Sequence, residues 1–311
     1  MKPAILLIGT NGQVGRELRK TLPSVGDVTA LDRNQLDLAH PEQIRKAIRD
    51  FRPNLIVNAA AYTAVDRAET EEDVARAINA TAPEIMAEEG QKIGAGIVHY
   101  STDYVFDGTK RIPYTEDDLT NPQNVYGKTK LEGEHAIQGS GAPHLIFRTE
   151  WVYATEGRNF LLTILKLATQ RKELRIVADQ VGSPTFSGEI ARTTANILSK
   201  IYSGKAQKEG SLAEVSGVYH LTAAGETTWC DFARAIVREA KSIDPETPWF
   251  AVATNRLPLI TQSVVPIGTS DYPVPARRPA YSVLSNNRLV RTFSESLGDW
   301  RGQLRALFKE S

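Results

Sequence analysis

The stretch "AILLIGTNGQVGRELRKTL", residues 4–22, decides the fold. Its first part, Ala4 to Ile8, is a short bounded apolar run, which is typical of a strand buried on both faces of a parallel sheet. Apolar residues at helical spacing follow from Val14 to Leu22. The stretch therefore predicts a strand, a glycine-rich turn and a helix, the first unit of an α/β fold.

The turn contains Gly9, Gly12 and Gly15 in a G-x-x-G-x-x-G pattern. Glycines let a backbone turn sharply and approach a pyrophosphate, whose charge is favoured by the N-terminus of the following helix. Asp32 stands about 20 residues beyond the loop, where an acid that binds the adenosine ribose belongs. An ordinary turn or cap would use the same residues. Arg33 could meet a 2′-phosphate, so NADH and NADPH both stay open as cofactors.

The first half of the chain alternates strand-like and helix-like segments. Further strands are predicted at residues 28–31, 55–57, 97–100 and 145–147, and helices at 41–51, 71–89 and 125–137. This alternation predicts a doubly wound parallel sheet with helices on both faces. In the second half, proline- and glycine-rich segments interrupt short helices such as 229–240, which indicates a smaller lobe over the cleft.

Composition restricts the partners. Lysines plus arginines number 37 and aspartates plus glutamates also 37, so no net charge favours nucleic acid or an anionic membrane. The single cysteine, Cys230, excludes an internal disulfide framework and fits a reducing compartment. The apolar start is too short for a membrane span and has no small-residue cleavage site. We expect a cytoplasmic, soluble protein with no nucleic acid and no membrane partner.

The segment "YGKTK" places Tyr126 and Lys130 on one face of a predicted helix. A phenol of unperturbed pKa ~10 is a poor acid–base group at neutral pH, and a neighbouring ammonium favours its ionised form. The spacing therefore predicts a lowered pKa for Tyr126, although such pairs are also common on solvated helices.

A second segment, "HYSTDYVFDG", gives the tyrosine–lysine pair its context. It carries a predicted strand out into Ser101, Thr102 and Asp103. Ligands bind at the carboxyl ends of strands in doubly wound sheets, so these side chains are expected at the same site. A turn hydroxyl is the alternative for Thr102.

Eight segments together resemble a known family: "GTNGQVG", "NAAAYTAVD", "HYSTDYVFDG", "NVYGKTKLEGE", "FRTEWVY", "DQVGSPT", "YHLTAAGETTW" and "PARRP". They are similar to the dTDP-4-dehydrorhamnose reductases, a family of extended short-chain dehydrogenases/reductases, over essentially the whole chain. The resemblance implies NADH- or NADPH-dependent reduction of the C4 ketone of dTDP-4-dehydro-L-rhamnose, the last step of dTDP-L-rhamnose biosynthesis. It also implies a Rossmann-like domain over residues 1–150, rejoined by about 187–225, and a substrate-binding lobe from 151–186 and 226–311.

The resemblance also implies roles for individual residues. The catalytic group is Thr102, Tyr126 and Lys130. The cofactor contacts are Gly9, Gly12, Gln13, Val14, Asp32, Arg33, Asp37, Leu38, Ala61, Tyr62 and Thr63, together with Tyr126 and Lys130. The dTDP-sugar contacts are Thr102, Asp103, Tyr104, Trp151 and Arg278. Further alternatives are Asp37 as a loop acid, the small residues of the Ala61 to Thr63 segment as packing against a helix, Trp151 as a core aromatic, and Arg278 as part of a surface turn.

Two positions depart from the family pattern. Glu150 stands where relatives carry a serine, which puts local substrate contacts in question. Some relatives form metal-linked dimers through acidic residues on the first helix and near the C-terminus. Glu17 matches, but Arg301 lies in the C-terminal neighbourhood, so we expect no metal and leave a homodimer open.

Three rival functions share the expected fold. A 4,6-dehydratase needs an Asp-Glu pair after the threonine, whereas Asp103 is followed here by Tyr104. A C4 epimerase shares the catalytic group, but the sequence around that group resembles that of the reductases. A non-catalytic regulatory subunit has no need of an intact Thr102, Tyr126 and Lys130.

Overall fold

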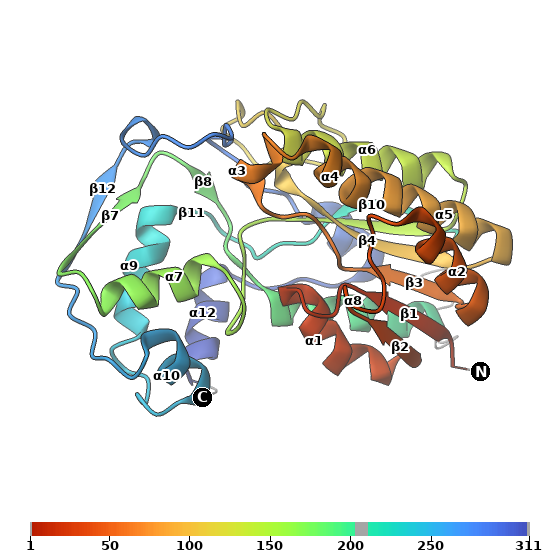
Figure 1. Cartoon of the computed structure of the whole chain (residues 1–311). Helices are drawn as coiled ribbons and strands as arrows, with labels where there is room; N and C mark the ends of the chain where they lie inside the picture. Colours follow the sequence, from red (N-terminus) through yellow and green to blue (C-terminus); the bar gives the residue numbers. More distant parts are fainter. Residues whose placement is uncertain (1, 203–210, 310–311) are drawn as a thin grey trace.

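The computed structural model describes residues 2–202 and 211–309 (Figure 1). Within them, six parallel strands form one sheet in the order β10-β5-β4-β3-β1-β2. Their bounds are β1 Ala4–Ile8, β2 Asp27–Leu31, β3 Leu55–Asn58, β4 Gly96–Thr102, β5 His144–Thr149 and β10 Gly217–His220. The predicted doubly wound parallel sheet is confirmed, and the five predicted strands differ from the observed ones by at most two residues at either end.

Helices cover both faces of this sheet because β1 alternates its side chains between two cores. Ile5 and Leu7 face one core, with side chains from α1 (Gln13–Thr21), α8 (Ser187–Tyr202) and α11 (Asn287–Phe293). Leu6 and Ile8 face the other, with α2 (Pro41–Phe51), α5 (Ala82–Ile93) and α6 (Val125–Gly139). All the parallel strands consequently end at one edge, and that edge carries the candidate site.

The helix predicted over 71–89 is confirmed as one unbroken helical stretch, although its hydrogen bonding changes along its length. It consists of α4 (Glu72–Arg76), a π-helical turn (Ala77–Thr81) and α5, which follow one another without a gap. Pro83 has no amide hydrogen to donate to the carbonyl of Asn79 four residues back, so a regular α-helix cannot pass through this point. That carbonyl instead lies against Gly133 of α6, where an added Cβ would come within 2.2 Å of it.

A second group of elements lies beside the sheet (Figure 1). Its helices are α7 (Phe160–Ala168), α9 (Trp229–Glu239), α10 (Pro248–Thr254) and α12 (Trp300–Lys309), and they enclose an aromatic core that includes Tyr153, Phe232 and Trp300. The predicted helix at 229–240 is confirmed by α9. The short strands are β6 Val152–Tyr153, β7 Glu173–Val177, β8 Val181–Gly182, β9 Thr185–Phe186, β11 Thr227–Thr228 and β12 Ser263–Ile267.

The chain returns to the sheet between its two passes through this second group. Helix α8 packs on α1, and β10 pairs with β5. The division into lobes at the predicted boundaries stays a prediction. Over the described ranges, no helix combines the length and apolar character needed to span a membrane. Cys230 is buried with a free thiol.

Candidate active site

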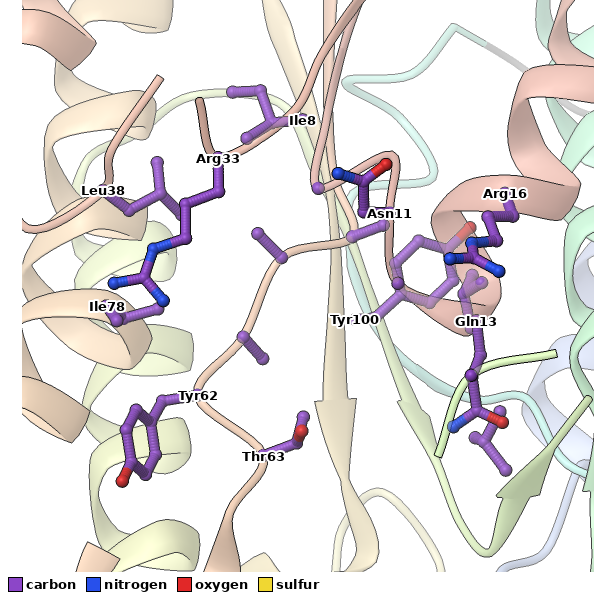
Figure 2. Close-up of a pocket in the computed structure, with 18 of the residues that line it drawn as sticks. Ile8, Asn11, Gln13, Arg16, Arg33, Leu38, Tyr62, Thr63, Ile78 and Tyr100 are labelled. Atoms are coloured by element: carbon purple, nitrogen blue, oxygen red, sulfur yellow. The ribbon is translucent and has the colours of Figure 1, made fainter. Parts of the chain in front are cut away.

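A cavity of about 540 Å³ opens at the carboxyl edge of the sheet. Its walls include the glycine loop, the segment after β2 and the loop after β3 (Figure 2). The first turns of α6 also line it, through Tyr126 and Lys130. It is lined by every residue predicted to contact the cofactor: Gly9, Gly12, Gln13, Val14, Asp32, Arg33, Asp37, Leu38, Ala61, Tyr62, Thr63, Tyr126 and Lys130. The topology therefore brings together Gly9 and Lys130, which lie 121 residues apart in sequence.

The glycine loop has the shape that a pyrophosphate site needs. Gly9 has a φ of +86°, and a Cβ there would lie 2.5 Å from the amide of Ala60. A Cβ on Gly15 would lie 2.1 Å from the carbonyl oxygen of Gly9, so only glycine lets α1 approach the loop this closely. No side chain in the described residues caps α1 at Gly12, and Oε1 of Gln13 is buried without a partner there. These groups fit an anion at the helix N-terminus.

The opposite end of the cavity carries the acid and base predicted for the adenosine. Asp32 accepts hydrogen bonds from the amides of Asn34 (2.8 Å) and Gln35 (3.2 Å), and from Nδ2 of Asn11 (3.3 Å). Asp32 thus caps the turn and also lines the cavity, and its contact with the adenosine ribose stays a prediction. Arg33 is exposed and lies on the same side of the pocket as Leu38 (Figure 2).

The tyrosine–lysine pair behaves differently from the prediction. Lys130 is 1% exposed, and its Nζ donates to the carbonyl of Tyr100 (2.6 Å) and lies 3.0 Å from Nε2 of His99. Burial lowers the pKa of Lys130 to about 7. Burial also raises the pKa of Tyr126 to about 12, partly opposed by a hydrogen bond with Thr102. The predicted lowering of the Tyr126 pKa is wrong, because burial raises this pKa by more than the hydrogen bond with Thr102 lowers it.

A second cluster lies outside this cavity on the other side of Tyr126. Thr102 is buried, donates from Oγ1 to Oδ1 of Asp103 (2.9 Å) and accepts from the amide of Tyr104 (3.1 Å). The rings of Tyr104 and Tyr126 meet edge to face at 5.6 Å. Burial raises the pKa of Asp103 to about 7. Tyr126 therefore borders both the cavity and the residues predicted for the sugar.

The two remaining substrate predictions are also outside the cavity. Trp151 is half-buried, has a φ of +45° and stacks on Trp229 at 3.4 Å. Arg278 donates from both guanidinium ends to Asp66, at 3.0 and 2.9 Å, and thereby lowers the pKa of Asp66. A diphosphate at Arg278 would have to compete with or join this ion pair. Both substrate roles stay predictions.

Glu150 is an anchor between segments of the chain. It is 1% exposed and accepts from the amides of Ser183 (2.9 Å) and Leu284 (3.2 Å) and from the hydroxyl of Ser282 (3.2 Å). Burial and the nearby Asp103 raise its pKa well above the usual range. Glu150 thus binds two backbone segments of the second half to the end of β5.

Other residues at the site had no signal in the sequence. Arg16 on α1 forms an ion pair with Glu156 across 140 residues of chain, and both line the cavity. Asn58 and His99 lie in neighbouring strands beneath Lys130, at 3.1 Å from each other. Only the folded sheet brings these groups together, so their spacing in the sequence could not reveal them.

Known proteins are similar to this chain over its whole length, both in sequence and in fold. The family model described as "RmlD substrate binding domain" matches residues 1–311. A dTDP-4-dehydrorhamnose reductase from Burkholderia thailandensis is 48% identical over 297 residues, covering 96% of this chain and 95% of that protein. Among solved structures, the dTDP-4-dehydrorhamnose reductase of Clostridium acetobutylicum has a TM-score of 0.84 at 35% identity, covering 99% and 98%. That of Bacillus anthracis, in complex with NADP, has a TM-score of 0.85 at 31% identity and covers both chains fully.

Proposed function

We propose, since the chain belongs to the dTDP-4-dehydrorhamnose reductase family, that it reduces the C4 ketone of dTDP-4-dehydro-L-rhamnose to dTDP-L-rhamnose. This makes it an NAD(P)H-dependent oxidoreductase of nucleotide-sugar metabolism, acting at the last step of dTDP-L-rhamnose biosynthesis. The observation that carries the proposal is the position of Tyr126, which lies between the cavity of the dinucleotide residues and the Thr102–Asp103–Tyr104 cluster.

When bound in the cavity, a reduced nicotinamide would supply the hydride for C4 of the sugar. The residues of the chain handle the proton and the developing charge. Tyr126 keeps its proton at neutral pH because its pKa is about 12, so it is ready to donate to the alkoxide. Thr102 is held by the Tyr104 amide and offers a hydroxyl beside Tyr126. A fixed donor at the point where negative charge develops lowers the barrier most when water is excluded.

The rest of the cavity binds and orients. Gly9 and Gly12 let the backbone approach a pyrophosphate at the start of α1, and Asp32 lies at the ribose end. Arg33 is the residue that we expect to distinguish NADPH from NADH, since a guanidinium suits the 2′-phosphate that only NADPH carries. The proposal includes a dTDP-sugar as the substrate and the cytoplasm as the location. It leaves both a monomer and a homodimer open.

Two alternatives have less support. In a 4,6-dehydratase, a glutamate would stand at position 104, where Tyr104 instead packs edge to face on Tyr126. A non-catalytic regulatory subunit would not need Lys130 buried beside the cavity. Burying a lysine opposes folding, and buried ionisable groups with shifted pKa values are typical of functional sites.

The proposal is tested by the turnover of Tyr126→Phe, with Tyr272→Phe as the matched control because Tyr272 is 61% exposed. Both proteins are incubated with dTDP-4-dehydro-L-rhamnose and NADH or NADPH, and the absorbance of the reduced nicotinamide is followed. We expect Tyr126→Phe to lose about 100- to 10,000-fold in rate, the usual contribution of a general acid. Tyr272→Phe should match the unsubstituted protein. Equal rates in all three would remove Tyr126 from the mechanism.

A further inference from the structure

Two buried carboxyl groups meet where the second half of the chain crosses the end of the sheet. Asp103 follows β4 and is 2% exposed, and Glu150 follows β5 and is 1% exposed. The hydroxyl of Ser282 donates to Oε2 of Glu150 at 3.2 Å, and it interacts with the carboxyl of Asp103 as well. Over the described ranges, neither carboxyl forms an ion pair with a lysine or an arginine.

Ser282 can act as a donor to only one of these carboxyls at a time. A hydroxyl has a single hydrogen and can otherwise only accept, and an ionised carboxyl has no hydrogen to offer it. One of the two groups therefore has to be a carboxylic acid. The other contacts allow this: Glu150 accepts from two backbone amides, Oδ1 of Asp103 accepts from Thr102, and Oδ2 of Asp103 is buried without a partner of its own. One proton completes the set, and the Ser282 hydroxyl reverses if this proton changes sides.

The electrostatics of the pair lead to the same state. Two carboxylates in one buried site repel each other, and each has lost its water, so such pairs keep a proton well above the ordinary pKa of a carboxyl. Burial raises the pKa of Asp103 to about 7, and burial together with Asp103 raises the pKa of Glu150 well above its usual range. The two groups consequently titrate as one unit.

The pair also holds one end of a segment that reaches across the site, residues 276–285, which we call the strap. At the sheet, the amide of Leu284 in the strap donates to Oε1 of Glu150 at 3.2 Å. At its other end, Arg278 is paired with Asp66 of α3 (Val65–Ala68) at 2.9 Å. Glu150 is therefore one of the anchors that determine where Arg278 lies.

We infer that Asp103, Ser282 and Glu150 form a proton-sharing unit, in which Glu150 and Ser282 are positioning residues for the strap. While the unit keeps its one proton, the strap stays fixed against the end of the sheet. Loss of this proton at alkaline pH leaves two negative charges facing each other and releases the strap together with Arg278. The consequence for a nucleotide sugar rests on the proposed function, in which Arg278 meets the diphosphate.

The titratable side chains that face the unit are phenols. Tyr104 and Tyr126 face Asp103, and Tyr281 faces Glu150. Burial raises the pKa of Tyr104 and of Tyr281, so both stay neutral through the range in which the unit titrates. Ionisation of Tyr126 is followed separately, because a phenolate absorbs in the near ultraviolet and a carboxylate does not. A change in the carboxyl signal can therefore be assigned to the pair.

Infrared spectroscopy tests the shared proton directly, because a protonated carboxyl has its own C=O stretching band. Ordinary carboxyls, with pKa values of ~4, are ionised at pH 8, so we expect this band from one group of the wild-type protein. Asp103→Asn and Glu150→Gln should both lose it, since the remaining carboxyl no longer has a like charge beside it. Glu173→Gln, at an exposed position of β7, should keep it.

Two infrared results would overturn the inference. One is a wild-type protein without the band at pH 8. The other is a band that persists in Asp103→Asn or in Glu150→Gln, because the proton would then belong to one residue and not to the pair. If Glu150→Gln does not fold, Asp103→Asn and the wild-type protein still decide between these results.

Binding of dTDP-L-rhamnose, measured by calorimetry at increasing pH, tests the release of the strap. Its affinity should fall about tenfold or more over the range in which the infrared band disappears, because Arg278 loses its place at the diphosphate. The affinity for NADPH should stay constant, since no residue of the strap lines the dinucleotide cavity. Ser282→Ala should weaken the binding of dTDP-L-rhamnose at neutral pH and flatten its pH dependence. Ser270→Ala, at an exposed position, should change neither.

The outcomes separate this inference from the proposed function. The infrared band needs no nucleotide sugar, so a shared proton in a protein that binds no dTDP-L-rhamnose would refute the proposed function alone. Reductase turnover without the band at pH 8 would refute the inference alone. An affinity for dTDP-L-rhamnose that stays constant while the band disappears would refute the role of Glu150 and Ser282 in positioning the strap.

Discussion

Replacing Asp103 with asparagine should make the protein more stable at alkaline pH but not at acidic pH, where the variant should be equally stable or less stable. Asp103 is 2% exposed, and burial raises its pKa from the ordinary 3.8 to about 7. The folded state therefore binds a proton that the unfolded state releases between these values. The stability of the wild-type protein falls as the pH rises through this window, and the full cost is present above the folded pKa.

The expected size follows from the shift. A rise of about 3 pH units at about 1.4 kcal/mol per unit costs on the order of 4 kcal/mol at pH 8, and about a third of that at pH 5. Asparagine removes this cost and keeps an oxygen for the Thr102 hydroxyl. Its amide group takes the place of Oδ2, which has no hydrogen-bond partner within the described residues. The buried amide is therefore also without a partner, which lowers the stability of the variant by about 1–3 kcal/mol. The net gain at pH 8 is about 1–3 kcal/mol.

Urea denaturation followed by tryptophan fluorescence at pH 5 and pH 8 measures the effect. We expect the difference in unfolding free energy between Asp103→Asn and wild type to be about 2–3 kcal/mol more favourable at pH 8 than at pH 5. Asp50→Asn, at an exposed position of α2, is the control for removing a carboxylate. The same difference at both pH values would refute a raised pKa for Asp103. Loss of turnover in the stabilised variant would fit a substrate role for the carboxylate.

Other consequences can be checked in the same protein. Lys130→Met should lower both turnover and cofactor affinity, measured by steady-state kinetics, whereas Lys128→Met at an exposed position of the same helix should not; an effect on thermal stability alone would make Lys130 structural. Arg33→Ala should weaken NADPH about tenfold or more relative to NADH in fluorescence titrations, because a contact with a phosphate is worth ~1.5–3 kcal/mol; equal changes would place Arg33 in solvent. Glu89→Gln should cost about 2 kcal/mol of stability at pH 7. The hydrogen bond from Arg49 lowers the pKa of Glu89 from 4.5 to about 2, and solvent around the half-exposed Arg49 makes the stabilisation smaller than this shift alone would give. This loss should be complete above pH 4.5 and disappear as the pH falls through 2; a loss independent of pH would mean that packing, and not charge, is involved.

The sheet was predictable because its signals are local. Strands β1, β3, β4 and β5 are buried along nearly their whole length, as Leu6 and Leu7 of β1 show by facing opposite cores, and only the edge strand β2 is partly exposed. The order of the strands then gathers their carboxyl ends, so residues predicted separately for a cofactor line one cavity. β10 was missed, since "GVYH" is too short to stand out.

The smaller group of elements was not predictable in detail because its pairings are distant and short. Thr227 and Thr228 of β11 pair with Gly182 and Val181 of β8, and two residues give no periodicity to detect. Proline and glycine positions marked the breaks between elements without indicating which ends would meet.

The sequence predicted where Tyr126 and Lys130 lie, but not the direction in which the pKa of Tyr126 is shifted. The i, i+4 spacing places Tyr126 and Lys130 on one face of α6, as predicted. It contains no information on the direction of Nζ, which is fixed by the Tyr100 carbonyl and by His99 on the adjacent strand. Burial, which is a property of the whole fold, then raises one pKa and lowers the other.

The transfer of hydride to the C4 carbon is the central claim, and a labelled cofactor tests it most directly. The purified protein is incubated with dTDP-4-dehydro-L-rhamnose and a reduced nicotinamide that carries deuterium at its transferable position, and the sugar product is examined by NMR. The account predicts dTDP-L-rhamnose with one deuterium at C4, formed in step with oxidation of the nicotinamide. Recovery of unreduced sugar, or of product with deuterium at another carbon, would contradict it.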